Sequence, residues 1–153
     1  MALHRSIRVL VVEDSPAYLY LIERAFSQRG QEIRWEVTVA ADGQEAVQIL
    51  FAEEAGKSPL PDMILLDWNL PKISGSEVLR KVKQHEHLRK IPILVFSSSQ
   101  ADEDIHSAYG DYANGFITKP DDSSKLASIV ETIEQFWISV ARIPKVLRQT
   151  GSC

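Results

Sequence analysis

The sequence has almost no cysteine: the only one, Cys153, is the last of 153 residues. An internal disulfide is therefore excluded, and a reducing compartment is compatible with the sequence. Long hydrophobic runs are also missing, because nowhere do about 18 apolar residues follow one another. The residues before Val9 include basic side chains but no apolar segment of the kind found in signal peptides. We expect a cytoplasmic protein that does not enter a membrane.

An excess of positive charge is absent as well. Lys and Arg together number 17 against 21 for Asp and Glu, which gives a net charge of −4. Binding to nucleic acid or to an anionic membrane needs a clustered positive field, so we expect neither partner. The 44% of hydrophobic residues and 25% of charged residues are typical of a globular protein. The length favours one domain, which we place at residues 1–144, with a C-terminal tail at residues 145–153.

Short apolar runs alternate with longer segments that have the period of a helix. The expected strands, in chain order, are residues 9–12, 35–39, 63–66, 93–96 and 115–118. Residues 35–39 alternate between apolar and polar, which suits an edge strand, whereas residues 63–66 and 93–96 are continuously apolar and suit the centre of a sheet. Five βα units in succession predict an α/β protein of the flavodoxin-like (βα)5 class. It would have a doubly wound, five-stranded parallel sheet with strand order 2-1-3-4-5.

Helix boundaries are indicated by local signals. Ser15 followed by Pro16 predicts the start of the first helix, and Gly30 predicts its end. The spacings Asp42-x-x-Glu45 and Ser74-x-x-Glu77 match the capping box of a helix start. We expect a fourth, shorter helix from about Ala101. The fifth carries an apolar stripe made up of Leu126, Ile129, Val130, Ile133, Phe136, Trp137 and Val140.

Polar side chains end the apolar runs. Glu13 and Asp14 follow the first run, Asp67 the third, Ser97 the fourth and Lys119 the fifth. Ligands of open α/β sheets bind beyond the carboxyl ends of the strands, so we expect these side chains to converge at one rim. Three adjacent carboxylates would repel one another unless a cation were bound. An oxygen-only ligand set suits Mg²⁺ rather than zinc, and Lys119 and Ser97 could then contact the oxygens of a phosphoryl group.

Each of these residues also has an ordinary structural interpretation. Glu13 and Asp14 could form a polar loop after a strand, and Ser97 could cap a helix. Lys119 and Pro120 could mark a simple strand end with a turn. Asp67 is harder to explain in this way, because the next helix starts only at Ser74. The simultaneous placement of five polar residues at strand ends favours a functional site.

Together these residues resemble a known family. Through Glu13-Asp14, Asp67-x-x-x-Pro71-x-x-x-Gly75, Ser97 and Lys119-Pro120, residues 7–140 resemble the response-regulator receiver domains of bacterial two-component systems. The resemblance implies that residues 1–144 form a receiver domain, that Asp67 is the phosphoryl acceptor, and that Asp14 and Asp67 bind Mg²⁺. It further implies that Glu13 acts mainly through water and that the backbone carbonyl of Asn69 is a metal ligand.

The same resemblance assigns the remaining roles. Lys119 would pair with the acidic residues and then with the phosphoryl group, and Pro120 would follow a cis peptide bond. Ser97 stands where many members carry Thr, and Phe116 occupies the aromatic switch position. A sensor histidine kinase would supply the phosphoryl group. Residues 67–72, the Phe136-Trp137 pair and the extension containing Pro144 look similar to small regulators of phytochrome-type histidine kinases.

Other functions remain open at the level of sequence. An aspartate-nucleophile phosphatase would need a second Asp two residues after the nucleophile, but Asn69 stands there, so we expect a protein that is not an enzyme. A pseudo-receiver that binds partners without phosphorylation is the alternative, and the presence of Asp14, Asp67 and Lys119 argues against it. Finally, the apolar stripe through Trp137 is longer than one small sheet normally covers. It favours a homodimer formed through the last helix and the tail. The alternative is that these aromatic residues only cap the core and that residues 145–153 are a frayed tail.

Overall fold

The structure is a computed structural model that describes residues 5–28, 33–54, 56 and 59–144. Its strands are β1 (Arg5–Val12), β2 (Ile33–Ala40), β3 (Met63–Asp67), β4 (Ile93–Ser97) and β5 (Gly115–Thr118). Its α-helices are α1 (Pro16–Ser27), α2 (Gly43–Glu54), α3 (Gly75–Lys83), α4 (Asp102–Gly110) and α5 (Ser123–Ile133). A short 3-10 helix, η1, covers Leu88–Lys90, and a π-helix, η2, covers Glu134–Val140. The predicted alternation of five strands and five helices is confirmed.

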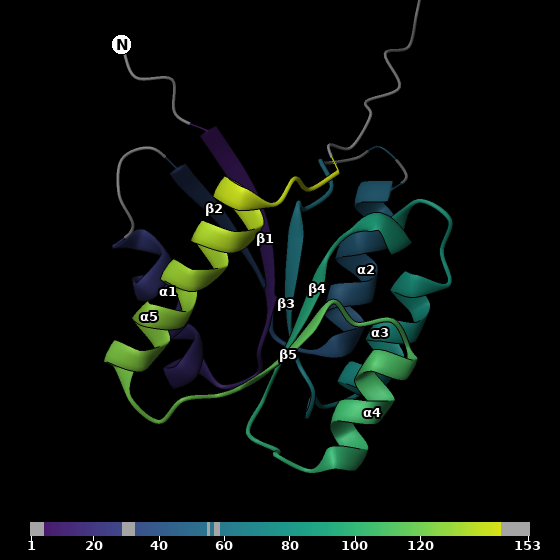
Figure 1. Cartoon of the computed structure of the whole chain (residues 1–153). Coiled ribbons are helices and arrows are strands. Elements are labelled where there is room, and N and C mark those ends of the chain that lie inside the picture. Colours follow the sequence, from purple (N-terminus) through teal and green to yellow (C-terminus); the bar gives the residue numbers. More distant parts are fainter. Residues whose placement is uncertain (1–4, 29–32, 55, 57–58, 145–153) are drawn as a thin grey trace, which may run out of the picture.

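All neighbouring strands run parallel, in the order β2-β1-β3-β4-β5 (Figure 1). The predicted flavodoxin-like topology is therefore confirmed, with β2 at one edge. The register aligns the strand ends, since Val12 pairs with both Ala40 and Leu66. One step further along the sheet, Asp67 pairs with Phe96. The residues that follow β1, β3, β4 and β5 are thus brought to one rim.

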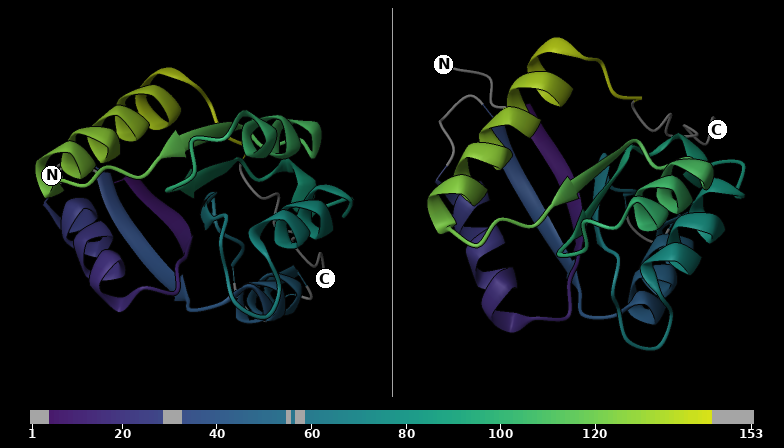
Figure 2. Two further views of the ribbon diagram at one scale, coloured as in Figure 1. Left: turned by 90° about the horizontal axis from the view of Figure 1, so that it is seen from below. Right: turned by 60° about the horizontal axis from the view of Figure 1, so that its bottom comes forward.

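Helices cover both faces of the sheet (Figures 1 and 2). α1 and α5 lie side by side on one face, where Ile22, Phe26, Leu126 and Val130 join the inward side chains of the strands in one core cluster. α2, α3 and α4 cover the other face, where a second cluster contains Leu50, Leu79 and Ala108 among others. The central strands β3 and β4 are buried along their whole length, as their continuous apolar sequences predict.

The predicted helix starts are confirmed. The side chain of Ser15 accepts a hydrogen bond from the backbone N–H of Tyr18, and Ser74 accepts one from Glu77. Each bond satisfies a backbone donor that has no partner within the helix. α1 ends at Ser27, and the predicted end at Gly30 lies outside the described residues.

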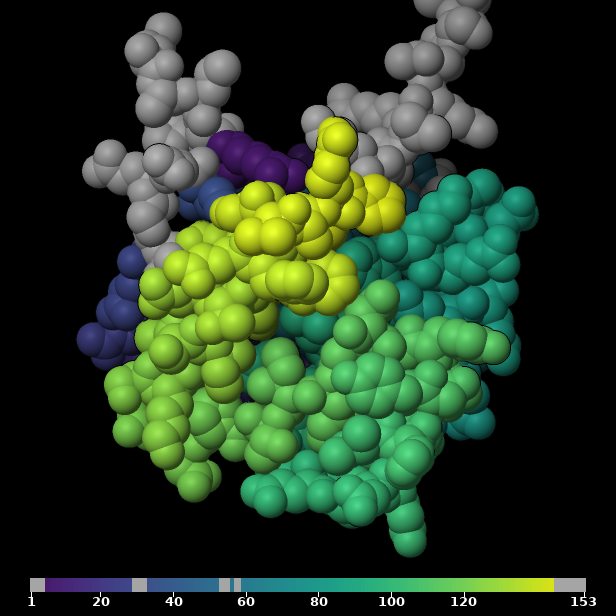
Figure 3. Space-filling view, in the orientation of Figure 1, coloured from purple at the N-terminus to yellow at the C-terminus, as the bar shows by residue number. Residues whose placement is uncertain are grey.

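The last helix differs from its prediction. After Ile133 the backbone passes into the π-helix η2, which has more residues per turn than an α-helix. The side chains therefore no longer follow the predicted stripe: Ile138 is buried, whereas Phe136 and Val140 are 53% and 75% exposed. Figure 3 shows this segment, in yellow, at the surface. The predicted tail, residues 145–153, lies outside the described residues.

No helix in the described part of the chain has both the length and the apolar character needed to cross a membrane.

Candidate functional site

Three carboxylates meet at the rim of the sheet. Glu13 and Asp14 directly follow β1, and Asp67 is the last residue of β3. One carboxylate oxygen from each lies within 4.8 Å of the others. Glu13 and Asp67 are only 3% and 4% exposed, whereas Asp14 is exposed to solvent. The predicted convergence of these three residues is therefore confirmed, and the exposed carboxylate of Asp14 leaves the cluster in contact with solvent.

Lys119 enters the site from the carboxyl end of β5. Its Nζ lies 2.7 Å from Oε2 of Glu13 and 3.3 Å from Oδ2 of Asp67. The Lys119 ammonium also lies 4.7 Å from the centre of the Tyr18 ring, a cation–π arrangement. Lys119 thus balances part of the negative charge that β1 and β3 bring together.

The environment changes the acidity of Asp67. Burial is the main cause that raises the pKa of this carboxyl group, from 3.8 to about 6, and the neighbouring Glu13 raises it further. Lys119 and the backbone N–H of Asn69, which donates a hydrogen bond of 3.3 Å to Oδ1 of Asp67, act in the opposite direction. Burial also raises the pKa of Tyr18, to about 12, with a further contribution from Glu13. Tyr18 is therefore a neutral phenol at physiological pH.

Ser97 ends β4 and is completely buried. Its Oγ accepts a hydrogen bond of 3.0 Å from the backbone N–H of Ser99, and its carbonyl oxygen accepts one of 2.8 Å from the N–H of Lys119. The alternative that Ser97 caps the next helix is wrong, because α4 begins at Asp102 with Ala101 at its N-cap. Ser97 instead fixes a turn at the rim and holds the backbone of Lys119 beside β4.

Phe116 lies on β5 and packs, partly buried, against the core cluster between the sheet and α2, α3 and α4. Its ring centre lies 6.4 Å from that of Trp68, in an edge-to-face arrangement. Trp68 follows Asp67 and is 7% exposed. A chain of side-chain contacts therefore runs from the residue beside Asp67 to β5.

One predicted feature of the site is wrong. The described residues contain no cis peptide bond, so the bond between Lys119 and Pro120 is trans. The cis and trans isomers of a peptide bond before proline differ in free energy by only about 0.5–1 kcal/mol, in favour of trans. A sequence pattern therefore does not fix the isomer. Lys119 reaches the acidic residues with the trans bond in place.

The donor set fits a hard divalent cation. Glu13, Asp14 and Asp67 offer carboxylate oxygens only, and neither histidine nor cysteine belongs to this cluster. Two of these carboxylates are buried, where their mutual repulsion is weakly screened. Mg²⁺ prefers oxygen ligands and keeps several waters, which the solvent beside the exposed Asp14 can supply.

Several residues of the site were not identified from the sequence. Tyr18, under the Lys119 ammonium, lies in the first turn of α1 and had been assigned no role, because its position beside Lys119 follows only from the tertiary fold. Lys72 and Gly43, which lie where the loop after β3 meets α2, had also been assigned no role in the site. Lys72 has a left-handed backbone conformation, which a glycine would have indicated in the sequence but a lysine does not.

The chain matches a known protein family over most of its length. Residues 9–131 match the response regulator receiver domain, and the chain belongs to this family. Members act as signalling domains of two-component systems. The chain is 39% identical over 138 residues to the probable methanogenesis regulatory protein FilR2 of Methanothrix harundinacea, covering 89% of this chain and 86% of that protein.

Two relatives are named as response regulators. The chain is 35% identical over 137 residues to the response regulator Rcp1 of Synechocystis, covering 89% of this chain and 92% of Rcp1. A solved structure of Rcp1 contains Mn²⁺ and superimposes with a TM-score of 0.81 at 34% identity, covering 90% of this chain and 99% of that structure. The structure of the phosphorylated cyanobacterial phytochrome response regulator RcpA gives a TM-score of 0.83 at 38% identity, with coverage of 94% and 100%.

Proposed function

We propose that this receiver domain accepts a phosphoryl group on Asp67 from a sensor histidine kinase, with Mg²⁺ bound by Asp14 and Asp67. The observation that carries this proposal is the assembly around Asp67. Its carboxylate is buried beside Glu13, the Lys119 ammonium is 3.3 Å away, and Asp14 completes the acidic cluster. A pseudo-receiver that works without phosphorylation would have no need of this combination.

The proposed reaction is a phosphoryl transfer between side chains. An Oδ atom of Asp67 attacks the phosphorus of a kinase phosphohistidine, so that an O–P bond forms as the N–P bond breaks. The electron pair of the broken bond stays on the imidazole, which takes up a proton, and the product is an acyl phosphate. The Lys119 ammonium, already 3.3 Å from Asp67 Oδ2, neutralises charge on the transferred oxygens.

The divalent cation, when bound, would neutralise carboxylate charge and the charge on the transferred oxygens. Asp14 and Asp67 would be its direct side-chain ligands, Glu13 would act mainly through water, and the backbone carbonyl of Asn69 would be a further ligand. The Mn²⁺ in the solved structure of Rcp1 supports a divalent cation in this family.

Phosphorylation would then be read out through β4 and β5. A phosphoryl group adds roughly 1.5 to 2 negative charges. This charge would attract the Ser97 hydroxyl, whose oxygen now accepts a hydrogen bond from the backbone N–H of Ser99. The space released would admit Phe116, whose ring already lies in the cluster beside Trp68. The outcome is a shift between two packings that changes the surface of α4, β5 and α5.

The proposed partner is a phytochrome-type kinase, supported by the name of RcpA, a phytochrome response regulator. Transfer of radiolabel from autophosphorylated histidine kinases to the protein tests this directly. A phytochrome-type kinase should label the parent within seconds to minutes and leave Asp67→Asn unlabelled. Labelling by unrelated kinases only would refute the choice of partner, and labelling of Asp67→Asn would refute the acceptor.

We further propose a homodimer through the last helix and the tail. Phe136 and Val140 of η2 have exposed apolar side chains, and the Phe136 ring packs edge-to-face against the partly buried Trp137. Covering one large aromatic side chain contributes roughly 1.5–3 kcal/mol, which is significant in a modest symmetric interface. Because η2 continues α5, association would be coupled to the surface that phosphorylation changes.

A further inference from the structure

The loop between β3 and α3, residues 68–74, has an uncommon backbone conformation at Lys72. The φ angle of Lys72 is 66°, in the left-handed region that residues other than glycine rarely adopt. Such a conformation persists only where its surroundings hold it. The loop begins directly after Asp67, so whatever holds Lys72 also holds the segment next to the proposed phosphoryl acceptor.

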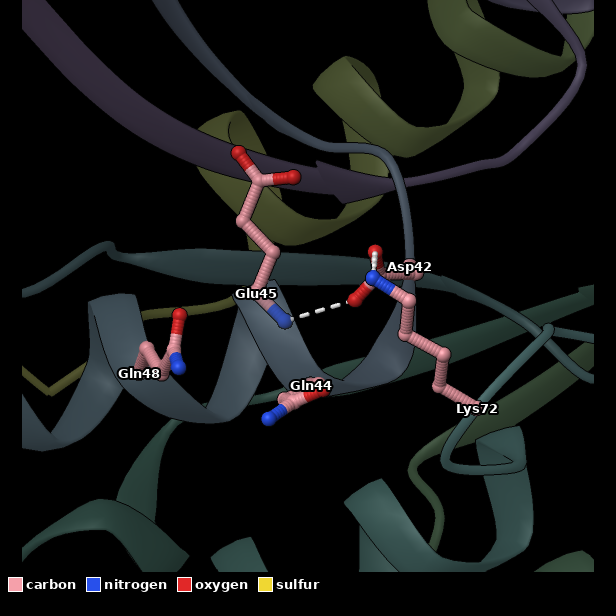
Figure 4. Close-up of a pocket in the computed structure, with 5 residues that line it drawn as sticks. All are labelled: Asp42, Gln44, Glu45, Gln48 and Lys72. Atoms are coloured by element: carbon pink, nitrogen blue, oxygen red, sulfur yellow. Dashed lines mark hydrogen bonds and ion pairs between the residues drawn. The ribbon is translucent and has the colours of Figure 1, made fainter.

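An ion pair connects Lys72 to the start of α2. Its Nζ lies 3.2 Å from Oδ2 of Asp42, and Figure 4 shows the Lys72 side chain extending from the loop to Asp42. Both residues line an open polar pocket. Asp42 is itself fixed, because its Oδ1 accepts a hydrogen bond of 2.8 Å from the N–H of Glu45. This bond and, to a smaller degree, the Lys72 ammonium hold the pKa of Asp42 below its ordinary value.

A backbone contact closes the same junction. Gly43 is the first residue of α2, and a β-carbon at this position would overlap with the carbonyl oxygen of Ile73. The side chain of Ile73 packs against the core cluster under α2 and α3. The loop therefore meets the start of α2 at two adjacent points: an ion pair at Lys72 and, at Ile73, a close backbone approach that the absence of a side chain at Gly43 permits.

The segment that leads into α2 also contacts the end of β1, which carries Glu13. The backbone N–H of Glu13 donates a hydrogen bond of 3.0 Å to the carbonyl of Ala40, the last residue of β2. Asp42 follows two residues later. The segment from Ala40 to Gly43 therefore contacts both parts of the chain that supply carboxylates, the β1 end through Glu13 and the β3 loop through Lys72.

We infer that Lys72 is a positioning residue of the acidic site. By pairing with Asp42 it holds residues 68–74 in the conformation in which the Asn69 amide bonds to Asp67. Lys72 does not reach the carboxylates itself, so its effect on a bound cation passes through the loop. This inference rests on the proposed function, since it concerns the affinity of the same site for Mg²⁺.

The test is a calorimetric titration of the full chain with Mg²⁺ alone, at constant pH and ionic strength. Lys72→Met removes the ammonium, and Asp42→Asn removes the charge while keeping a good N-cap. Long-range electrostatics alone would make Mg²⁺ bind more tightly to Lys72→Met and more weakly to Asp42→Asn. Positioning by the pair instead lowers the affinity in both, by about two- to fivefold, the range expected for a largely exposed ion pair.

Further variants complete the comparison. The double variant should bind no more weakly than the weaker single variant, because the pair is already broken. Lys72→Arg keeps a cation beside Asp42 and should retain the Mg²⁺ affinity of the parent. Lys90→Met removes an exposed lysine of η1 and should also leave the Mg²⁺ affinity unchanged. Circular dichroism and the free energy of unfolding report on folding in each case. A purely structural role would lower the free energy of unfolding of Lys72→Met without changing its Mg²⁺ affinity.

The outcomes separate the inference from the function on which it rests. Opposite signs in the two single variants, equal affinity in all variants, or additive losses in the double variant would each overturn the role of Lys72 while the proposed function stands. A parent protein that binds no Mg²⁺ would overturn both.

Discussion

The Lys119 ammonium lies closer to Glu13 than to Asp67. Its Nζ is 2.7 Å from Oε2 of Glu13 and 3.3 Å from Oδ2 of Asp67. Lys119 therefore has its shorter contact with the carboxylate that is not the proposed acceptor. Because Glu13 holds its ammonium, Lys119 can stay in the site while the charge on Asp67 changes. The oxygens of a phosphoryl group on Asp67 would then be within a short movement of Lys119.

We expect Lys119→Met to separate the metal from the phosphoryl group. Lys119 is no metal ligand in the proposal, so the variant should still bind Mg²⁺ in a calorimetric titration. It should accept a phosphoryl group from acetyl phosphate about 10²-fold more slowly, because charge on the transferred oxygens is no longer neutralised. A phosphorylation rate equal to that of the parent would contradict the role of Lys119.

Asp14→Ala should lose the Mg²⁺ binding that Lys119→Met keeps. Asp14 is the exposed member of the acidic cluster and a proposed direct ligand, so its removal should abolish the response of tryptophan fluorescence to Mg²⁺. Trp68, next to Asp67, is the expected reporter. Asp102→Ala, which removes an exposed carboxylate at the start of α4, is the matched control and should bind as the parent does. Equal affinity of Asp14→Ala and parent would exclude Asp14 from the site.

The raised pKa of Asp67 predicts a pH-dependent stability. Between pH 3.8, the ordinary pKa, and about 6, the pKa in the folded state, the folded protein holds more protons than the unfolded chain. The free energy of unfolding therefore falls as pH rises through this interval. In the presence of a chelator, Asp67→Asn should be more stable than the parent by about 1–2 kcal/mol at pH 7, after allowance for screening by solvent.

Denaturant unfolding at several pH values checks this expectation. The difference between Asp67→Asn and the parent should shrink toward zero near pH 4, where Asp67 is protonated in both states. Added Mg²⁺ should stabilise the parent more than the variant, because a ligand that binds the folded state alone raises its stability. A difference that does not change with pH would show that burial does not raise the pKa of Asp67.

Replacement of Phe136 tests the dimer. Trp137 packs against two core clusters, so a change there would also disturb the fold. Phe136 is 53% exposed, and Phe136→Glu should therefore prevent association without a loss of stability. Gln135→Glu adds the same charge at a neighbouring exposed residue and serves as the control. A parent that remains a monomer in light scattering at high concentration, with and without phosphorylation, would refute the proposal.

The sequence predicted those parts of the molecule that depend on local pattern. Continuous apolar residues at 63–66 and 93–96 indicated the two central strands, and Ser15, Asp42 and Ser74 indicated helix starts, because capping is a local interaction. The convergence of Glu13, Asp14 and Asp67 could also be predicted, since parallel strands end at one rim.

Features that depend on tertiary packing were missed or wrong. The isomer of the bond before Pro120 and the π-helical turn at Glu134–Val140 differ from alternatives by small free energies that no local pattern reports. The contact of Tyr18 with Lys119 joins residues that are 101 positions apart in the sequence, so only the tertiary structure reveals it. The roles of the site residues, Ser97 and Phe116 included, stay predictions.

The intact mass of the protein after incubation with Mg²⁺ and acetyl phosphate shows whether Asp67 accepts a phosphoryl group. The parent should gain the mass of one phosphoryl group, hydroxylamine should remove it, and Asp67→Asn should gain none. A modification that persists in Asp67→Asn, or that resists hydroxylamine, would contradict the assignment of Asp67 as the phosphoryl acceptor.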